Sequence, residues 1–421
     1  MSDDARALED PFERFNRRQQ AGAVRDPYAR WAELAAMGPV VKVDVRELVG
    51  AAMLDAPAEA SDPGADGFSG LEIYTAVHYD AVVEILRDAK RFTSSGYAMT
   101  MGPVMGRTIL EMDPPEHTAH RALIQQAFTR RALERWERDV VRPVIDEYID
   151  GFAARGRAEL VRELTFPFPV SVVARMMGLP VDSHANFHRW AIELISITFD
   201  LKGAHRASRN LRALFAEVLA ERRKRPQDDL ISLLAEAELD GERLDDEAIF
   251  GFLCLLAPAG AETTYRSSSN LLCALLGDPA QLDAVRDDRT LVDRAIEEGL
   301  RWECPLTGIM RTATVDTEVC GVEIPAGSIV NVCLAAANRD ARRYENPNRF
   351  DVHRRSTQHV AFATGAHACL GMHLARMETR VLVESLFDRL GNLRLTPDAD
   401  DVHVTGLIFR SPLSLPVCFD S

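Results

Sequence analysis

One segment constrains the fold of this 421-residue chain more than any other. Between Asp245 and Leu276, apolar residues recur on nearly every side of the predicted helix instead of forming a single stripe. A helix that is apolar all round is buried inside a protein, because none of its faces suits water. The chain is long enough to build a large core around such a helix, and 47% of its residues are hydrophobic. The segment therefore predicts a central, buried helix.

The remaining segments divide into a mainly helical part and a smaller β region. Apolar spacing is almost wholly helical from Glu116 to about Gly277, and one more helix is predicted from about Met372 to Leu390. Short strands with turn signals are predicted between 306 and 335, and strands again close the chain. No internal repeat or change of composition marks a domain boundary. We therefore expect a single, mainly α domain with a smaller β region.

The N-terminal part carries two predicted strands, Val40–Val45 and Glu72–Thr75, around a surface insertion. The insertion, "AAMLDAPAEASDPGADGFSG", is rich in residues that favour turns over regular structure. A short amphipathic helix is predicted in "HYDAVVEILRD", just after the second strand. Residues 1–25 are expected to be poorly ordered, so the domain is expected to span 26–421.

The balance of charges argues against nucleic-acid binding. The chain has 49 Lys+Arg against 64 Asp+Glu, a net charge of −15, whereas binding phosphate needs clustered cations. No apolar run approaches the ~20 residues that a membrane helix needs, and the N-terminus has no signal-peptide core. We expect a cytoplasmic protein that binds neither nucleic acid nor membrane.

One of the seven cysteines, Cys369, lies in an unusual stretch, "FATGAHACLG". The odd number and the absence of a C-x-x-C pair argue against a disulfide framework, and the other six are expected to be buried small side chains. Cys369 directly precedes a predicted helix, whose dipole favours a thiolate, and Gly365 and Gly371 allow a tight turn and the close approach of a flat group. These features favour a thiolate ligand to haem iron. The alternative is zinc held by His367, Cys369 and His373, although no fourth ligand is near.

A second unusual stretch, "LAPAGAETTYRSS", lies inside the long helix. Pro258 removes a backbone hydrogen bond at a cost of about 3 kcal/mol, and Gly260 adds roughly 1 kcal/mol. Glu262, Thr263 and Thr264 follow directly. A carboxylate and a hydroxyl beside a distorted turn can hold a small ligand and waters that relay protons. The alternative, a kinked core helix with back-bonded threonines, leaves a buried glutamate unexplained.

These stretches resemble the cytochrome P450 family of haem-thiolate monooxygenases. "FATGAHACLG" is similar to the family's F-x-x-G-x-H-x-C-x-G loop, and "AGAET" to its A-G-x-D/E-T motif. In "EEGLRW", Glu298 and Arg301 can meet on one helix face, and "EGLR" resembles the family's E-x-x-R pair. The motifs occur in the family's order, and the resemblance extends from about Asp26 to the C-terminus, with further landmarks in "MDPPEHTAHRAL", "IPAGSIV" and "ANRDARRYENPNRFDVHR". It implies the cytochrome P450 fold, with haem b (iron protoporphyrin IX) between the long central helix and the cysteine loop and its helix.

The resemblance also implies roles for individual residues. Cys369 would be the proximal thiolate ligand, and Glu262 and Thr263 would be the acid–alcohol pair that delivers protons to dioxygen. The other residues expected at the haem are Phe362 beneath the ring, Gly371 beside it, and the propionate-binding His117, Arg121, Arg311 and His367. Those expected to lock the proximal side of the fold are Glu298, Arg301 and Arg349. Ala363 departs from the family, in which many members carry glycine or serine, and we expect this methyl group to tune the site without abolishing it.

The resemblance further predicts substrate-lining segments, including the loop from Gly96 to Leu110. The apolar side chains expected in the pocket are Met105, Leu194, Ile197, Ala259, Leu306, Ile309, Ile408 and Phe409. They predict an apolar organic substrate of small to medium size: terpenoid, steroid-like, fatty or aromatic. Arg107 could anchor a carboxylate, but we interpret it as a solvated loop residue.

The absence of a fused reductase predicts electron transfer from a ferredoxin and its NAD(P)H-dependent reductase. Positive charge for docking an acidic ferredoxin could come from five arginines: Arg130, Arg131, Arg354, Arg355 and Arg376. Two other functions stay open: a peroxide-driven peroxygenase, which needs no acid–alcohol pair, and a haem-binding module that recruits another protein without turnover.

Overall fold

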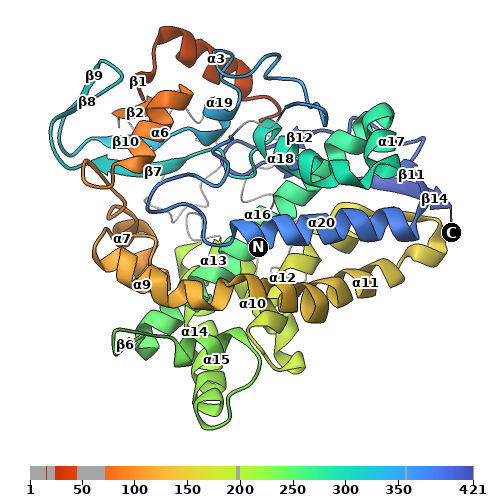
Figure 1. Ribbon diagram of the computed structural model, residues 1–421, viewed down its shortest axis with the longest axis horizontal. Helices are drawn as coiled ribbons and strands as arrows, with labels where there is room; N and C mark the ends of the chain where they lie inside the picture. The colour runs from red at the N-terminus through yellow and green to blue at the C-terminus, as the bar shows by residue number, and fades with distance from the viewer. Residues whose placement is uncertain (1–15, 17–23, 45–71, 196–199, 356–357, 421) are drawn as a thin grey trace.

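Helix α16 (Asp246–Gly277) runs through the middle of the molecule, as Figure 1 shows. Asp245 caps its N-terminus by accepting a hydrogen bond from the Ala248 N–H. The helix continues through Pro258 without interruption. It packs against α12 (Pro167–Met176), α14 (Leu201–Lys224), α18 (Val292–Trp302) and α20 (Met372–Arg389). The prediction of a central, buried helix is confirmed.

This helix is also long and apolar enough to cross a membrane, contrary to the prediction that no segment of the chain is. Its most apolar window is nevertheless 67% buried inside the protein. The helix is therefore apolar because it lies in the core, where the surrounding helices bury its side chains.

The computed structural model describes residues 16, 24–44, 72–195, 200–355 and 358–420. The predicted insertion and most of the predicted N-terminal segment 1–25 lie outside these residues. Helices form most of the molecule, in agreement with the predicted mainly α class (Figure 1). The other helices are α3 (Tyr28–Met37), α6 (Tyr79–Arg87), α7 (Tyr97–Thr100), α8 (Gly102–Met105), α9 (Glu116–Gln125), α10 (Arg130–Trp136), α11 (Arg142–Asp150), α13 (His184–Ile195), α15 (Leu230–Glu236), α17 (Pro279–Asp287) and α19 (Leu334–Asn338).

The main sheet has five strands in the order β1-β2-β10-β7-β3. The strands are β1 (Val40–Asp44), β2 (Glu72–Ala76), β10 (Ile329–Val332), β7 (Ile309–Ala313) and β3 (Phe92–Thr93). The two strands predicted around the insertion pair with each other antiparallel, with Val40 opposite Ala76. In Figure 1 this sheet lies with α3, α6 and α19 at one side of the molecule, away from the helices around α14.

Smaller sheets complete the β region. The C-terminal strands β11 (Gly391–Leu395) and β14 (Pro416–Asp420) pair with each other, and β14 also pairs with β4 (Arg157–Glu159). Two-stranded pairs are β12 (Val404–Thr405) with β13 (Ser411–Pro412), β8 (Thr317–Val319) with β9 (Val322–Ile324), and β5 (Glu238–Leu239) with β6 (Glu242–Arg243).

Strands β4, β5 and β6 correct our prediction of almost unbroken helix from Glu116 to Gly277. The β5–β6 hairpin turns at Asp240 and Gly241, whose φ angles are +53° and +83°. An Asp-Gly pair with two positive φ angles suits the two-residue hairpin turn, because aspartate tolerates that region and glycine prefers it. The turn therefore ends the helical run after α15, although the flanking residues also suit a helix.

Candidate active site

The loop before α20 is shaped by its glycines and by a backbone bond to the cysteine. The Cys369 N–H donates to the Phe362 carbonyl at 2.9 Å, which closes the loop. Gly365 has a φ of +78°, and a Cβ there would overlap the Leu86 carbonyl oxygen at the end of α6. Gly371 differs, because a Cβ there would meet nothing within 4 Å. Gly365 is thus required by the fold, whereas Gly371 borders open space.

Ala363 occupies a left-handed conformation, with a φ of +54°. For an L-residue with a Cβ this region costs roughly 1–2 kcal/mol, and for glycine it does not. Alanine in place of the glycine found in some family members is therefore a source of backbone strain in the cysteine loop.

We expect Ala363→Gly to raise the free energy of unfolding by about 1 kcal/mol, because relief of the strain exceeds the entropy that glycine adds to the unfolded chain. The shift of the urea midpoint measures it. Ala361→Gly is the matched control, since Ala361 lies two positions away and does not have a positive φ; it should be destabilising. An equal loss of stability in both variants would contradict the strain.

Two opposing effects act on the pKa of the Cys369 thiol. Its side chain is exposed, although neighbouring protein atoms partly desolvate the thiol. This desolvation raises the pKa of the thiol above its ordinary value, while the Gly371 N–H and the charges of Arg121 and Arg376 favour the thiolate. The helix terminus alone therefore does not produce the thiolate that the sequence predicts, and a bound cation would be needed to complete the deprotonation.

Helix α16, which packs against α20, carries a stripe that the described protein does not cover. Ala259 is exposed, and Leu255, Thr263 and Ser267, which extend the four-residue spacing along the helix, are partly exposed. Most of the helix on its other sides is buried. Residues four apart lie on one helix face, so this is a single uncovered stripe inside the domain. Such a stripe needs a non-protein group against it.

Four basic side chains gather near the cysteine without a carboxylate partner. His117 and His367 have ring centroids 4.1 Å apart, and each leaves a buried Nε2 without a hydrogen-bond partner. Burial, together with the charges of His117, Arg311 and Arg121, lowers the pKa of His367 to about 3. Burial also lowers the pKa of Arg121 and Arg311.

Within the described part of the chain, neither guanidinium forms an ion pair. Burial lowers the pKa of both His117 and Arg311, and the nearby Asp113 offsets only part of this effect. The Asp113 oxygens accept hydrogen bonds from Thr93 and the Ser94 N–H. A cluster of cations and donors with unsatisfied atoms is a site for a doubly charged anionic group. The two propionates of haem match this requirement.

Phe362, predicted to lie beneath the haem, packs against a charged group. The Arg376 guanidinium is 4.5 Å from the centre of its ring. Arg376 also donates to both oxygens of Glu297, at 2.6 and 2.8 Å. Burial opposes ionisation of Glu297, but hydrogen bonds from Arg376 and His359 outweigh it and lower its pKa to about 2. Arg376 is therefore neutralised and contributes little charge to the surface.

The predicted acid and alcohol lie on different faces of α16. The Thr263 hydroxyl, on the uncovered stripe, donates to the Ala259 carbonyl at 2.8 Å. Glu262 is buried and accepts a hydrogen bond from Arg266 Nε at 2.5 Å. Burial raises the pKa of Glu262, and Arg266 opposes the rise. The motifs in the sequence do not include Arg266, although its i, i+4 spacing from Glu262 is a known signal for such pairs.

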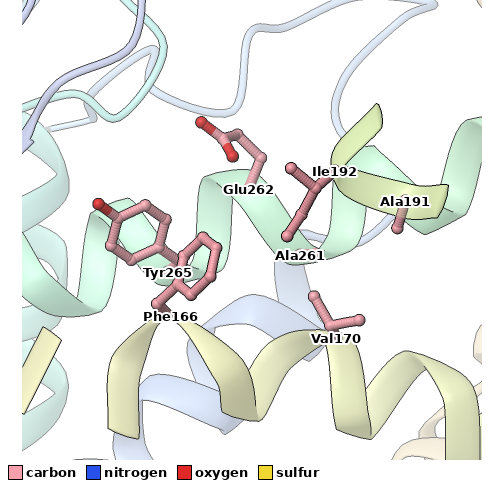
Figure 2. A pocket seen from close by; sticks show the side chains of 7 residues that line it. All are labelled: Phe166, Val170, Ala191, Ile192, Ala261, Glu262 and Tyr265. Carbon is pink, nitrogen blue, oxygen red and sulfur yellow. The ribbon is translucent and has the colours of Figure 1, made fainter. Parts of the chain in front are cut away.

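Glu262 borders a cavity of about 10 Å³, shown in Figure 2, which has room for one water molecule. In Figure 2 its carboxylate projects from α16 away from Phe166 and Val170. The remaining walls are Ala191, Ile192, Ala261 and Tyr265. Glu262 and Thr263 are adjacent in sequence, but each bonds a different partner, Arg266 and the Ala259 carbonyl respectively.

The predicted structural lock is present with one change of partner. Glu298 and Arg301 form a two-point ion pair, at 2.7 and 2.8 Å, in which both side chains are buried. Arg349 supplies its backbone carbonyl to Arg301 at 3.1 Å, not its side chain. The second guanidinium on Glu298 belongs to Arg354, at 3.0 Å. This bond corrects the prediction that Arg354 belongs to an exposed patch.

The predicted pocket residues fall into two groups. In the first group, the C-terminal turn pairs with the segment before β7. Leu306 and Phe409 form an antiparallel β-bridge, and the Thr307 N–H donates to the Ile408 carbonyl at 2.9 Å. Leu306, Ile309 and Phe409 are partly exposed, and Ile408 is 40% exposed. Met105 and Leu194 are buried and do not reach open space. Ile197 lies outside the described residues.

A hollow of about 440 Å³ is lined by the predicted substrate loop and the residues next to it. It is lined by Ser95, Ala98, Gly102, Gly106, Arg107, Glu111 and Met112. Arg107 is ion-paired with Glu116, and Glu111 accepts two hydrogen bonds from Thr108. Both charged side chains in its wall are therefore already engaged.

The donor set fits haem better than zinc. In the part of the chain that the structure describes, no three histidine, cysteine or acidic side chains come together as metal ligands. His373, one of the three candidate zinc ligands, is exposed. Haem instead accounts for the single cysteine, the uncovered stripe on α16 and the unpaired basic cluster.

Comparisons with known proteins agree with this assignment. The family model "Cytochrome P450" matches residues 182–403. The chain is 40% identical to erythromycin C-12 hydroxylase of Saccharopolyspora erythraea over 76% of this chain and 82% of that protein. It is 33% identical to steroid C26-monooxygenase of Mycobacterium tuberculosis over 81% of this chain and 93% of that protein.

Among solved structures, CYP109E1 from Bacillus megaterium in complex with testosterone superposes with a TM-score of 0.81 and 28% identity. The match covers 94% of this chain and 100% of that one. Family members bind haem through a cysteine thiolate, the ligand for which Cys369 is placed. This chain belongs to the cytochrome P450 family and is a haem-thiolate monooxygenase.

Proposed function

We propose that this monooxygenase oxidises an uncharged, apolar substrate of about the size of a steroid, using electrons from a ferredoxin. The observation that carries the substrate class is the engagement of Arg107 with Glu116 at the hollow lined by the substrate loop. A carboxylate substrate needs a free cation, whereas this wall offers none among its lining residues. The volume of the hollow, about 440 Å³, falls in the range of small-molecule sites.

Haem, when bound, supplies the redox chemistry that activates dioxygen. The chain's own residues would hold it: Cys369 would provide a thiolate ligand, and the cluster of His117, Arg121, Arg311 and His367 would bind the propionates. Thr263 holds its hydroxyl at the uncovered stripe by donating to Ala259. From there it can accept or pass a proton once a water joins it to Glu262. The apolar residues at the C-terminal turn would exclude water from the substrate.

Two relatives support the substrate class, since one is named a steroid monooxygenase and another was solved with testosterone. We expect titration of the ferric, haem-loaded protein with testosterone to shift the Soret band saturably, because the substrate would occupy the pocket beside the haem. Palmitate, of similar apolar bulk but charged, should shift it much more weakly. A shift with palmitate alone would contradict the proposal.

The electron partner would dock on exposed arginines. Arg130, Arg131 and Arg355 are exposed, and Arg130 forms only a solvent-exposed ion pair with Glu134 at 2.9 Å. Arg354 and Arg376 are more covered and engaged with glutamates. Charge reversal at Arg130 and Arg131 should slow reduction by an acidic ferredoxin and weaken its salt dependence. An unchanged rate and salt dependence would contradict this docking site. We also place the protein in the cytoplasm, where such partners and NAD(P)H are present.

A further inference from the structure

The guanidinium of Arg266 joins α16 to the chain just after the C-terminal turn. It is 1% exposed, and besides Glu262 it donates to the Ser411 hydroxyl through Nη1 at 2.9 Å. The Tyr265 hydroxyl lies 3.0 Å from the same Ser411 oxygen. The guanidinium also lies 5.5 Å from the centre of the Phe409 ring. One buried side chain therefore contacts both the acid of the central helix and the turn predicted to face substrate.

The charge of this guanidinium determines the state of its partner. Arginine stays protonated at any physiological pH, so it supplies a fixed positive charge. Glu262 is only 4% exposed, and a carboxyl so buried becomes neutral unless a charge is beside it. Arg266 provides that charge by an ion pair within one helix.

The same contact fixes where the carboxylate lies. Successive helical residues project about 100° apart, so Glu262 does not point along the stripe that carries Thr263. The bond to Arg266 holds it on its own face, and Ser411 in turn holds Arg266. A displacement of the turn at Phe409 and Ser411 would therefore also displace Arg266, which holds the Glu262 carboxylate.

We propose that Arg266 is a positioning residue that keeps Glu262 ionised and ties its location to the C-terminal turn, so that proton delivery depends on how substrate packs against Phe409. This proposal rests on the monooxygenase function above. In this proposal, Ser411 links Arg266, and through it Glu262, to the C-terminal turn.

The first test reads the acid itself, independently of turnover. In the haem-loaded full chain, infrared difference spectra against the wild type should show a new carboxylic-acid carbonyl band in Arg266→Gln. The band should vanish when Glu262→Gln is added, and Arg266→Lys, which keeps the charge, should not produce it. Absence of the band in Arg266→Gln would overturn the ionisation claim, whether or not the protein turns substrate over.

The second test reads proton delivery as the fraction of NAD(P)H converted to product and not to peroxide. Arg266→Gln should lower this fraction roughly tenfold at unchanged substrate affinity, the scale expected of a displaced proton-transfer group. Arg266→Lys should restore most of it.

Ser411→Ala keeps the proposal testable if Arg266→Gln does not fold. It should lower the coupled fraction by about threefold, near the lower end for one lost hydrogen bond, because Arg266 keeps its ion pair with Glu262. The matched control is Ser269→Ala, another buried serine, which lies on α16 and bonds Thr165 at 2.7 Å. The same coupled fraction in Ser411→Ala and Ser269→Ala would overturn the link to the turn.

Discussion

Replacing Glu298 by glutamine is expected to lower the free energy of unfolding by roughly 3–5 kcal/mol, the cost of leaving a buried guanidinium without its counter-charge. Arg301 is 1% exposed and Glu298 is 5% exposed, so water cannot compensate for the loss. Glu298 also accepts hydrogen bonds from Arg354 and from the Asp351 N–H, both at 3.0 Å. Most domains are stable by only about 5–15 kcal/mol, so the variant should bind haem poorly or not fold.

Urea unfolding followed by circular dichroism measures this effect. The control is Asp283→Asn, which removes the acid of an ion pair with the same i, i+3 spacing, to Arg286 at 2.6 Å, but with both partners more exposed. Exposed pairs contribute less than about 1 kcal/mol, so this variant should remain close to wild type. Similar losses in the two variants would show that burial of the Glu298 pair does not determine its contribution.

Glu378→Gln is expected to raise the free energy of unfolding, whereas Glu298→Gln should lower it. Glu378 lies on α20, is 2% exposed and is bonded to Thr264 of α16. Burial raises its pKa to about 8, from an ordinary value of 4.5 in the unfolded chain. Between these two values the unfolded chain is ionised at this position and the folded protein is not, so folding takes up a proton and stability falls as pH rises.

The loss of stability reaches about 3 kcal/mol near pH 7, at about 1.4 kcal/mol for each pH unit above the unfolded value. The glutamine of Glu378→Gln cannot titrate, so the gain in unfolding free energy of this variant over wild type should be below about 1 kcal/mol at pH 5 and increase steadily toward pH 8. The measurement is the difference in unfolding free energy between the two proteins at each pH, in which the other titrating groups cancel. A difference independent of pH would show that Glu378 is ionised in the folded protein.

The parts of the site that could be predicted are those whose residues lie close together in the sequence. Cys369 and its glycines, the acid and alcohol on α16, and the Glu298–Arg301 pair all lie within short motifs, and the structure places them on the expected elements. The helix α16 was predictable because its hydrophobicity has no polar face. The β5–β6 hairpin was missed although Asp240 and Gly241 carried its signal, because the helical spacing around them was given more weight.

Contacts between distant segments could not be predicted in the same way. Arg354 and Arg349 lie five residues apart in one loop, and only the folded backbone decides which guanidinium reaches Glu298. The role of Arg266 depends on Ser411, which is 145 residues away. Glu378 is one acid on a helix with many polar residues, and nothing in its neighbourhood in the sequence reveals its burial. Long-range packing determines each of these environments.

The central claim is that Cys369 holds haem as its thiolate ligand, and the carbon monoxide difference spectrum of the reduced protein tests it most directly. The wild type should show the strongly red-shifted Soret band of a thiolate-ligated haem, since the thiolate donates electron density to the iron. Cys369→Ser should lose that band while the far-ultraviolet circular dichroism of the fold is retained. A band typical of histidine ligation in the wild type, or an unchanged band in Cys369→Ser, would contradict this claim.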